Sequence, residues 1–440
     1  MSSTLLADRI QKGFEENLDE SKLLDCMRCG FCLPACPTYI HSNYDESQSP
    51  RGRLALMKAV RDGDIPFDDS VEESLDLCLG CRACEPACPA GVEYGSLIEN
   101  AWNVIREEKK PSIKEKTMRK VAFDHLFQDQ DKMNRAAGLV RIYQKSGLQT
   151  VARKLGITSF FPGIMPGMEK ILPEIEKNSF LRGKTFEAEQ QTTKVAFFAG
   201  CMMDTIFSGT NNATIKLLQK VGCDVWIPDN QVCCGALHGH SGELEKAKAN
   251  ARKNLDSFLL QDVDYIVNNA GGCGAFLSEY ENLLQDEPEY LWKAKQFSEK
   301  VIDITSLLYK KGIMNLPLAY TKGEELIVTY QDSCHLRNVN HVIDEPREIL
   351  KSIENVEFRE LEGAVHCCGS AGIYNLIHSE MAMRILDDRM KNVKKANPHV
   401  IITTNPGCLL QMKLGIERER LTDEIEALHI VDFIDKYIMN

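Results

Sequence analysis

The chain has 440 residues, enough for two or three domains, and its 43% hydrophobic and 26% charged residues are typical of a soluble globular protein. Its net charge of -12 argues against a nucleic acid partner, because contacts to phosphates use clustered Lys and Arg. The sequence contains no run of about 18 apolar residues, the length that a membrane-spanning helix needs, and residues 1–14 lack the apolar stretch of a secretory signal. We therefore expect a cytoplasmic protein whose 17 cysteines bind metal rather than form disulfides.

Two cysteine motifs with the spacing C-x2-C-x2-C-x3-C-P lie 52 residues apart in the first hundred residues. In two-cluster ferredoxins, the fourth cysteine of each such motif ligates the cluster of the other motif. This rule assigns one 4Fe–4S cluster to Cys26, Cys29, Cys32 and Cys88, and a second to Cys36, Cys78, Cys81 and Cys84. The alternatives are a pair of zinc sites or reactive thiols, because C-x2-C alone is common to both, but zinc sites usually take two pairs of ligands separated by a longer loop.

Short helices are expected around these motifs. Residues 19–24 lead into the first motif, and the apolar residues between 54 and 60 have helical spacing. Arg51 and Arg53, which precede the second of these helices, could neutralise cluster charge or could be solvated. Residues 1–105 are thus predicted to form a mostly helical, two-cluster ferredoxin-like domain.

Residues 106–190 are predicted to form a helical linker region. The stretch 101–190 contains no cysteine and has 17 Lys or Arg against 11 Asp or Glu, a net charge of +6. Apolar residues at helical spacing, at 121–127 and again at 139–143, indicate amphipathic helices. A basic face beside exposed apolar residues could contact an acidic partner or a membrane surface. A linker packed on its own core is the alternative.

The rest of the chain is an internal repeat, with one copy at 191–318 and the other at 319–440. Apolar strands alternate with helices, which predicts two tandem pseudo-symmetric α/β units with parallel sheets. The expected strands are 195–199, 265–267, 326–330 and 400–403, the expected helices include 212–220 and 244–259, and the copies end in similar tails at 301–304 and 430–433. The chain as a whole is therefore a multidomain α+β protein.

Each copy of the repeat carries four cysteines in three separate loops that follow strands. Open α/β sheets bind their ligands at this carboxyl edge. The two sets, offset by 133 to 135 residues, are Cys201, Cys233, Cys234 and Cys273, and Cys334, Cys367, Cys368 and Cys408. Gly235 and Gly369 follow the paired cysteines and would let the backbone approach a bulky cluster. Each set predicts a metal site, with buried structural thiols as the alternative.

Other residues near these loops have weaker assignments. Cys223 falls outside the repeat register and is predicted to be a core thiol. Four histidines flank the cysteine loops and could tune or replace a metal ligand, or could simply bond to the backbone: His238, His240, His335 and His366.

Two ferredoxin motifs followed by two Cys…Cys-Cys-Gly…Cys repeats resemble the iron–sulfur subunit of glycolate oxidase over nearly the whole chain, including the segment Ser49–Arg53. More distant likenesses are the iron–sulfur subunit of anaerobic glycerol-3-phosphate dehydrogenase, a lactate-utilisation protein and heterodisulfide reductase subunits. In the last of these, the repeat ends in C-x2-C and holds a noncubane cluster. Here Ala270 and Asn405 replace the first cysteine of that pair, which leaves a four-thiolate cluster or zinc.

The resemblance implies an electron-transfer subunit of a flavin-dependent 2-hydroxy-acid dehydrogenase acting on glycolate or D-lactate. FAD would lie on a partner subunit, and a quinone or another acceptor would take the electrons, with a peripheral contact at the inner face of the membrane compatible with this role. The chain has no G-x-G-x-x-G after a strand, no P-loop and no motif for nucleophilic catalysis, so we expect no catalytic residues in it. The alternatives are a heterodisulfide-reductase-like or quinone-reducing enzyme and a non-catalytic iron–sulfur sensor or scaffold.

Overall fold

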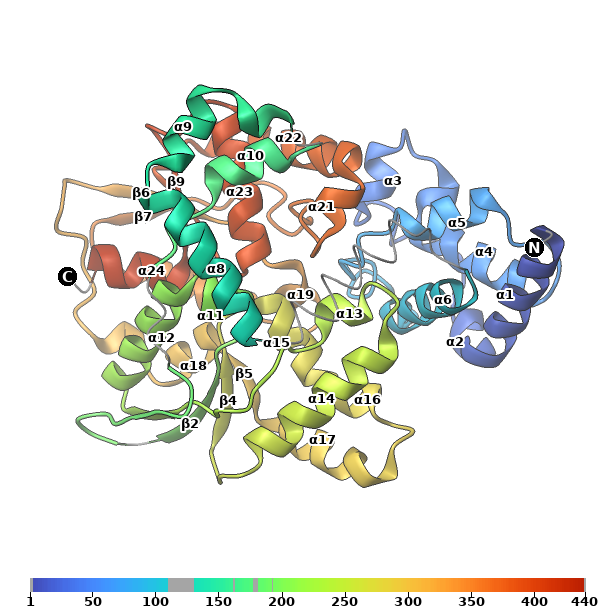
Figure 1. The fold of residues 1–440 in the computed structure, drawn as a ribbon, viewed down its shortest axis with the longest axis horizontal. Coiled ribbons are helices and arrows are strands. Elements are labelled where there is room, and N and C mark those ends of the chain that lie inside the picture. Colours follow the sequence, from blue (N-terminus) through green and yellow to red (C-terminus); the bar gives the residue numbers. More distant parts are fainter. Residues whose placement is uncertain (1–2, 110–129, 161–162, 177–180, 192, 439–440) are drawn as a thin grey trace.

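The computed structural model describes residues 3–109, 130–160, 163–176, 181–191 and 193–438. A helical amino-terminal part lies at one end of the molecule, beside two α/β units that form the bulk of it (Figure 1). The multidomain α+β class predicted from the sequence is confirmed. None of the described helices combines the length and the apolarity needed to cross a bilayer.

The amino-terminal part is built from short helices around one apolar core, in which Phe14, Met57 and Leu75 are fully buried. Ser49 caps the helix that follows the first motif by accepting a hydrogen bond from Gly52 N, and Pro occupies the first helical position. The helices expected at 19–24 and at 54–60 are present. The elements are α1 (Ser3–Asn17), α2 (Glu20–Leu24), α3 (Pro37–His41), η1 (Glu46–Gln48), α4 (Pro50–Arg61), α5 (Asp69–Asp76) and α6 (Tyr94–Glu108).

The two cysteine loops of this part share one backbone conformation. Arg28 and Gly30 in the first motif have φ of +56° and +89°, and the matching residues Gly80 and Arg82 in the second have +60° and +57°. Such left-handed turns direct backbone N–H groups into a concave surface that favours negative charge. The repeated motif therefore produces a repeated cradle.

The linker region contributes helices that lie over both α/β units (Figure 1). Helix α8 (Gln130–Lys145) contacts α11 (Met202–Thr205) of the first unit, in whose core Met133 is buried, and α10 (Met165–Ile171) lies over the second. Helix α10 packs on α23 (Pro406–Arg418), where a Cβ at Gly167 would meet Leu414. The helical spacing at 139–143 is confirmed, whereas the helix expected at 121–127 lies outside the described residues. The described elements are α8 (Gln130–Lys145), α9 (Leu148–Lys154), η3 (Ile157–Phe160) and α10 (Met165–Ile171).

The two α/β units have the same strand order. In the first sheet the order is β1-β3-β2-β4-β5, with β1 antiparallel at the edge and the other pairs parallel. In the second it is β7-β6-β8-β9, all parallel. The strands are β1 (Thr185–Phe186), β2 (Thr193–Phe198), β3 (Cys223–Trp226), β4 (Tyr265–Asn268), β5 (Val301–Asp303), β6 (Leu326–Tyr330), β7 (Val356–Phe358), β8 (Val400–Thr403) and β9 (Glu426–His429).

Helices connect the strands in both units, and the units share one continuous apolar core. Val195 and Val267 of the first sheet belong to the same buried cluster as Val328 and Val400 of the second. In the first unit the helices are α11 (Met202–Thr205), α12 (Ser208–Lys220), α13 (Ala236–Gly239), α14 (Leu244–Phe258), α15 (Gly271–Ser278), α16 (Tyr280–Leu283), α17 (Pro288–Lys300), α18 (Ile304–Lys310) and η4 (Ile313–Asn315). In the second they are α19 (Cys334–Asn338), α20 (Glu345–Lys351), α21 (Tyr374–Ile377), α22 (Ser379–Ala396), α23, α24 (Ile430–Phe433) and η5 (Ile434–Ile438).

The expected match between the tails of the two copies was wrong. Residues 301–303 form strand β5, whereas 430–433 form helix α24. The strand that occupies the place of β5 in the second sheet is β9. The cause is local, because His429 caps α24 by accepting a hydrogen bond from Val431 N and so begins the helix there.

Candidate iron–sulfur sites

Four cysteines from both ferredoxin motifs line one small cavity of about 290 Å³, open space at its mouth included. They are Cys36, Cys78, Cys81 and Cys84. Cys36 belongs to the first motif and the other three to the second, so the chain brings together the set that the crossed-ligation rule assigns to one cluster. Arg53 and Tyr94 line the same cavity.

Polar groups are directed at the sulfur atoms of this cavity. Gly80 N donates to Cys78 Sγ at 3.4 Å, and the Tyr94 hydroxyl donates to the same sulfur at 3.5 Å. Burial raises the pKa of the Cys81 and Cys84 thiols, with neighbouring cysteines adding to the effect. Bare thiols are therefore neutral here, and thiolates require a cationic group such as a metal cluster to balance them.

The other ferredoxin set is more open. Cys26 and Cys88 are half-buried against the amino-terminal core, and Cys29 is exposed. Burial raises the pKa of Cys32, and the nearby Cys26 contributes to the rise. The structure thus places Cys26 beside Cys32, and it places Cys88 against the same core as Cys26.

The repeat cysteines form two rows of sulfur atoms. In the first unit Cys201 Sγ lies 3.8 Å from Cys233 Sγ, and hydrogen bonds continue from Cys233 to Cys234 and on to Cys273. The second unit repeats this order, with contacts that link Cys334, Cys367, Cys368 and Cys408. Each unit therefore brings its four cysteines together at the carboxyl edge of its sheet. The cysteine pair lies in a loop as expected, whereas the other two cysteines lie at the starts of the helices that follow their strands rather than in loops: Cys201 caps α11, Cys273 is in α15, Cys334 begins α19 and Cys408 is in α23.

Each row offers four thiols as ligands. Among the described residues, no three Cys, His, Asp or Glu side chains already surround one point where a single ion could bind, and this is as true of the ferredoxin sets as of the rows. Cysteine thiolates ligate both structural zinc and iron–sulfur clusters, so the rows fit either group.

The glycine after each cysteine pair serves two purposes. Gly235 N donates to Cys233 Sγ at 3.5 Å and Gly369 N to Cys367 Sγ at 3.4 Å, so the backbone does approach the sulfur. Both glycines have positive φ, and a Cβ on Gly369 would lie 2.8 Å from Ala382 O of α22. The close packing of a helix, which the sequence prediction did not consider, is therefore a second reason for glycine.

Of the four histidines, His335 contacts a cysteine, with its Nδ1 3.7 Å from Cys334 Sγ. Burial, with His240 and Arg82 nearby, lowers the pKa of His335 to about 3, so its ring is neutral. His240 stacks on His335 with ring centroids 5.1 Å apart and pairs with Glu99 at 2.8 Å.

Of the remaining two histidines, His238 is buried in the fold, as is the extra cysteine, whereas His366 is half-buried. His238 is fully buried in α13, and burial lowers the pKa of His366, which lies beside Arg389. Cys223 is the first residue of β3 and is fully buried in the shared core, as predicted. Burial raises the pKa of Cys223 to about 11.

The second ferredoxin loop packs directly on the second row. Cys81 lies against the apolar cluster that contains Cys334 and Cys367, and Asn338 Nδ2 donates to Cys81 O at 2.9 Å. The Tyr374 hydroxyl donates to Leu77 O at 3.0 Å across the same contact. Nothing in the local sequence pattern signals these pairs, because they join residues more than 250 positions apart.

The two rows also meet each other. Asn405, three residues before Cys408, accepts a hydrogen bond from Gly272 N at 3.0 Å. Its side-chain amide also lies 3.8 Å from Cys408 Sγ. Asn405 therefore joins the first turn of α15, next to Cys273 in one unit, to the row in the other, and α15 packs against α19 beside it.

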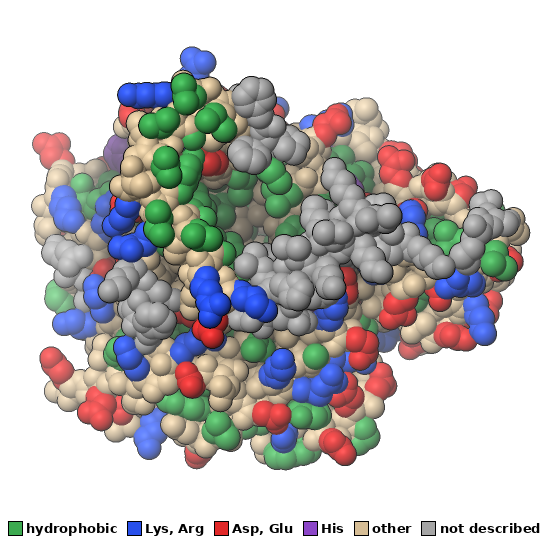
Figure 2. All heavy atoms as spheres, in the orientation of Figure 1, with side chains coloured by type: hydrophobic (Ala, Val, Ile, Leu, Met, Phe, Trp, Pro, Cys, Tyr) green, Lys and Arg blue, Asp and Glu red, His purple; other side chains and the backbone are tan. Residues whose placement is uncertain are grey.

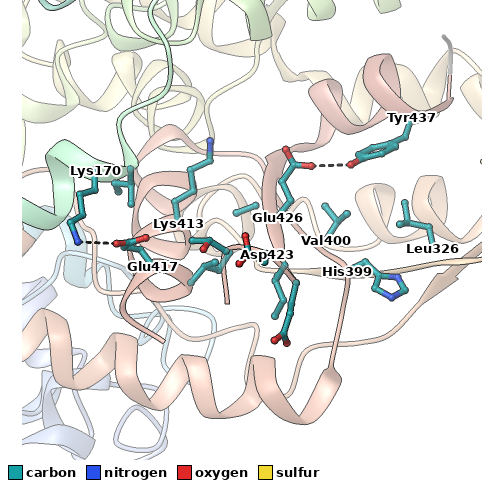
Figure 3. A pocket seen from close by; sticks show the side chains of 15 residues that line it. Lys170, Leu326, His399, Val400, Lys413, Glu417, Asp423, Glu426 and Tyr437 are labelled. Carbon is teal, nitrogen blue, oxygen red and sulfur yellow. Dashed lines mark hydrogen bonds and ion pairs between the residues drawn. The ribbon is translucent and has the colours of Figure 1, made fainter. Parts of the chain in front are cut away.

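A wider pocket lies at the other end of the second sheet (Figure 3). Its lining includes Leu326, His399 and Glu426 near the amino ends of three strands, and Lys170 bonds to Glu417 across it at 3.0 Å. Cys334 and Cys408 follow the carboxyl ends of the same sheet. This pocket is therefore separate from the cysteine sites.

Two cysteine-lined ferredoxin loops and two cysteine rows define an iron–sulfur protein. Family models agree in each part: a 4Fe–4S dicluster domain matches residues 22–92, and a cysteine-rich domain matches residues 195–278 and again 328–413. The linker region of the glycolate oxidase iron–sulfur subunit matches residues 114–172.

Comparison with individual proteins gives the same result. The chain is 52% identical over 429 residues to a probable glycolate oxidase iron–sulfur subunit from Bacillus subtilis, covering 97% of this chain and 96% of the relative. It is 28% identical to the glycolate oxidase iron–sulfur subunit of Escherichia coli over 92% and 93% of the two chains. Lactate utilization protein A of Bacillus subtilis is 29% identical over 55% of this chain and 99% of its own. The chain belongs to the family of glycolate oxidase iron–sulfur subunits, and so is a subunit of an oxidoreductase complex.

Proposed function

We propose that this chain carries electrons from a flavoprotein subunit, which oxidises a 2-hydroxy acid such as glycolate or D-lactate, to a quinone or another acceptor. Oxidation of the hydroxy acid to a 2-oxo acid releases two electrons and two protons, which FAD on the partner can accept together. The iron–sulfur subunit then takes the electrons one at a time. The names of the relatives support the substrate class.

The observation that carries this proposal is the continuity of the cysteine groups. The second ferredoxin set touches the second row through Cys81, and Asn405 links that row to the first. In this proposal the ferredoxin sets hold two 4Fe–4S clusters, with ligands Cys26, Cys29, Cys32 and Cys88, and Cys36, Cys78, Cys81 and Cys84. Each row holds a further iron–sulfur cluster, with zinc as the alternative that could brace the fold but not carry electrons.

The test uses the native complex, purified without oxygen. Glycolate or D-lactate should reduce the clusters, which electron paramagnetic resonance detects, and a soluble quinone should reoxidise them. Turnover of glycolate by this chain alone would instead support an enzyme in its own right. A complex whose clusters stay oxidised with every 2-hydroxy acid would overturn the proposal.

A quinone acceptor calls for contact with a membrane, and the linker helices offer a suitable face. Six large apolar side chains there are each at least 49% exposed: Leu139, Ile142, Leu148, Val151, Leu155 and Ile157. Hydrophobic side chains gather over α8 and α9 beside Lys and Arg in Figure 2. Residues 130–172 contain seven Lys or Arg and two Asp or Glu, in a chain of net charge -12. This combination fits an anionic lipid surface.

Flotation with lipid vesicles tests this contact. The complex should float with vesicles that contain anionic phospholipid and much less with purely zwitterionic ones. Leu139→Gln with Leu155→Gln should weaken flotation, whereas Leu260→Gln, which changes a leucine 72% exposed outside this face, should not. Equal flotation of the double variant would overturn the membrane contact.

A further inference from the structure

Arg53 is a fully buried guanidinium at the edge of the second ferredoxin site. Its Nε donates to Ser74 O at 2.6 Å, and its Nη2 donates to Gln48 Oε1 at 2.9 Å and to Thr38 Oγ1 at 3.1 Å. Its Nη1 lies 4.0 Å from Cys36 Sγ. Three of its four contacts are thus to neutral oxygen atoms, and the fourth is to a cysteine of the site.

A buried charge without a counter-charge is costly, so these neutral contacts do not explain why Arg53 is retained in the core. Arginine cannot escape the cost by losing its proton. The cavity is therefore positively charged where the four cysteines converge, and an anionic group there would balance it.

Arg51, two residues earlier, is in a different position. Its Nε and Nη2 pair with the two carboxylate oxygens of Glu46 at 2.7 and 3.0 Å, and its side chain is partly exposed. Its Nη1 donates to Arg28 O in the first cysteine loop at 3.0 Å. Because Glu46 and solvent already balance its charge, Arg51 has little charge left to offer the first ferredoxin site.

We propose that Arg53 is the fixed counter-charge of the cluster held by Cys36, Cys78, Cys81 and Cys84, and that it raises the reduction potential of this cluster above that of its neighbour. A 4Fe–4S core with four thiolates is anionic, and gains one more negative charge on reduction. A nearby cation stabilises the reduced form more than the oxidised form. Arg53 thus makes it more favourable for the electron to reside on the cluster whose loop packs on the second row.

This inference rests on the ligand sets of the proposed function. It also goes further, because it predicts that the two ferredoxin clusters differ and gives the direction. One electron moves from the reduced cluster of the first set to the oxidised cluster of the second, and no proton or other reactant is needed.

The test is a redox titration of the intact complex, followed by electron paramagnetic resonance. In Arg53→Gln, the cluster of the second set should be harder to reduce by tenfold or more, which is about 59 mV for a one-electron couple. Arg53→Lys keeps the charge and should stay close to the native potential. Arg51→Gln, the matched control, should leave the potential of this cluster unchanged.

The outcomes separate the possible failures. A native complex without iron and sulfide for two ferredoxin clusters would overturn the proposed function itself. An intact cluster with unchanged potential in Arg53→Gln would overturn only the role of Arg53. If Arg53→Gln loses the cluster, the Arg53→Lys variant distinguishes the two possible roles of Arg53. A cluster retained in Arg53→Lys at the native potential supports the role of the positive charge. Loss of the cluster in Arg53→Lys as well shows that Arg53 only braces the helices.

Discussion

The two α/β units share their strand order and their rows of cysteines, yet they have different neighbours. The second row lies against Cys81 of the ferredoxin part, whereas the first row is reached through Asn405 and the contact of α15 with α19. A repeat that is symmetric in sequence has therefore become asymmetric in its surroundings. In the proposed relay, the second unit stands next to the ferredoxin clusters and the first unit stands beyond it.

The test of this asymmetry with the largest expected effect replaces the equivalent cysteine in each unit. Cys368→Ser and Cys234→Ser should each remove the metal of their own row, since each residue lies in the middle of its row. Cys368→Ser should also interrupt electron exchange between the ferredoxin clusters and the first row. Metal analysis and rapid-freeze spectroscopy during reduction would measure both effects. Equal transfer defects in the two variants would contradict the order of the sites.

A similar comparison can be made within the ferredoxin part. Cys36→Ser should damage the cluster built mainly by the second motif, because Cys36 lines that cavity with Cys78, Cys81 and Cys84. The loss should be about four of roughly eight ferredoxin irons by the two-cluster rule. Spectra that resolve the two clusters would measure it. Damage confined to the cluster of Cys26, Cys29 and Cys32 would mean that the ligands do not cross.

A smaller effect is expected at the junction of the two rows. Asn405→Ala would leave Gly272 N without its partner, which should destabilise the protein by about 1–2 kcal/mol in urea unfolding. Asn405→Asp keeps the acceptor oxygen and should lose less stability than Asn405→Ala. Ala270→Gly, at the matching position of the first unit, is a control that removes no hydrogen bond between the units. If Asn405→Ala unfolds like the native chain, Asn405 does not hold the rows together.

Much of this architecture could be predicted from local sequence patterns. Runs of apolar residues gave the strands at 195–199 and 326–330, and the spacing of the cysteines gave their grouping, because both depend on residues close in the chain. Arg53 could not be assigned in this way, since only tertiary packing separates its burial from the exposure of Arg51. The contact of Cys81 with the second row likewise depends on how distant parts dock.

The wrong match between the tails has a different and local reason. The letters at 301–304 resemble those at 430–433, yet the residues that end the last strand and cap the next helix are Asp303 in one unit and His429 in the other. Both positions are buried, but one side chain is an acid and the other a base. The two units should therefore respond to pH in opposite ways.

The pKa values give the direction of each response. Burial raises the pKa of Asp303 from 3.8 to about 6, so the folded state binds its proton more tightly, and stability is lost as pH rises from about 4 to about 6. Burial lowers the pKa of His429 from 6.5 to about 4, so the unfolded state binds its proton more tightly, and stability is lost as pH falls from about 6.5 to about 4. The two contributions oppose each other over the same range.

Removing one group at a time should expose the other. Asp303→Asn keeps an oxygen that can accept the hydrogen bond from Thr305 N, and it leaves the pH dependence of His429 in place. The free energy of unfolding of this variant, relative to that of the native chain, should increase with pH between 4 and 6 by up to about 3 kcal/mol. In His429→Asn the relative stability should instead decrease over that range, whatever its offset from the lost bond to Asn269 O. Urea midpoints at several pH values measure both slopes. Because each slope is taken as a difference from the native chain, other titrating groups cancel, and two slopes of the same sign would contradict the opposition.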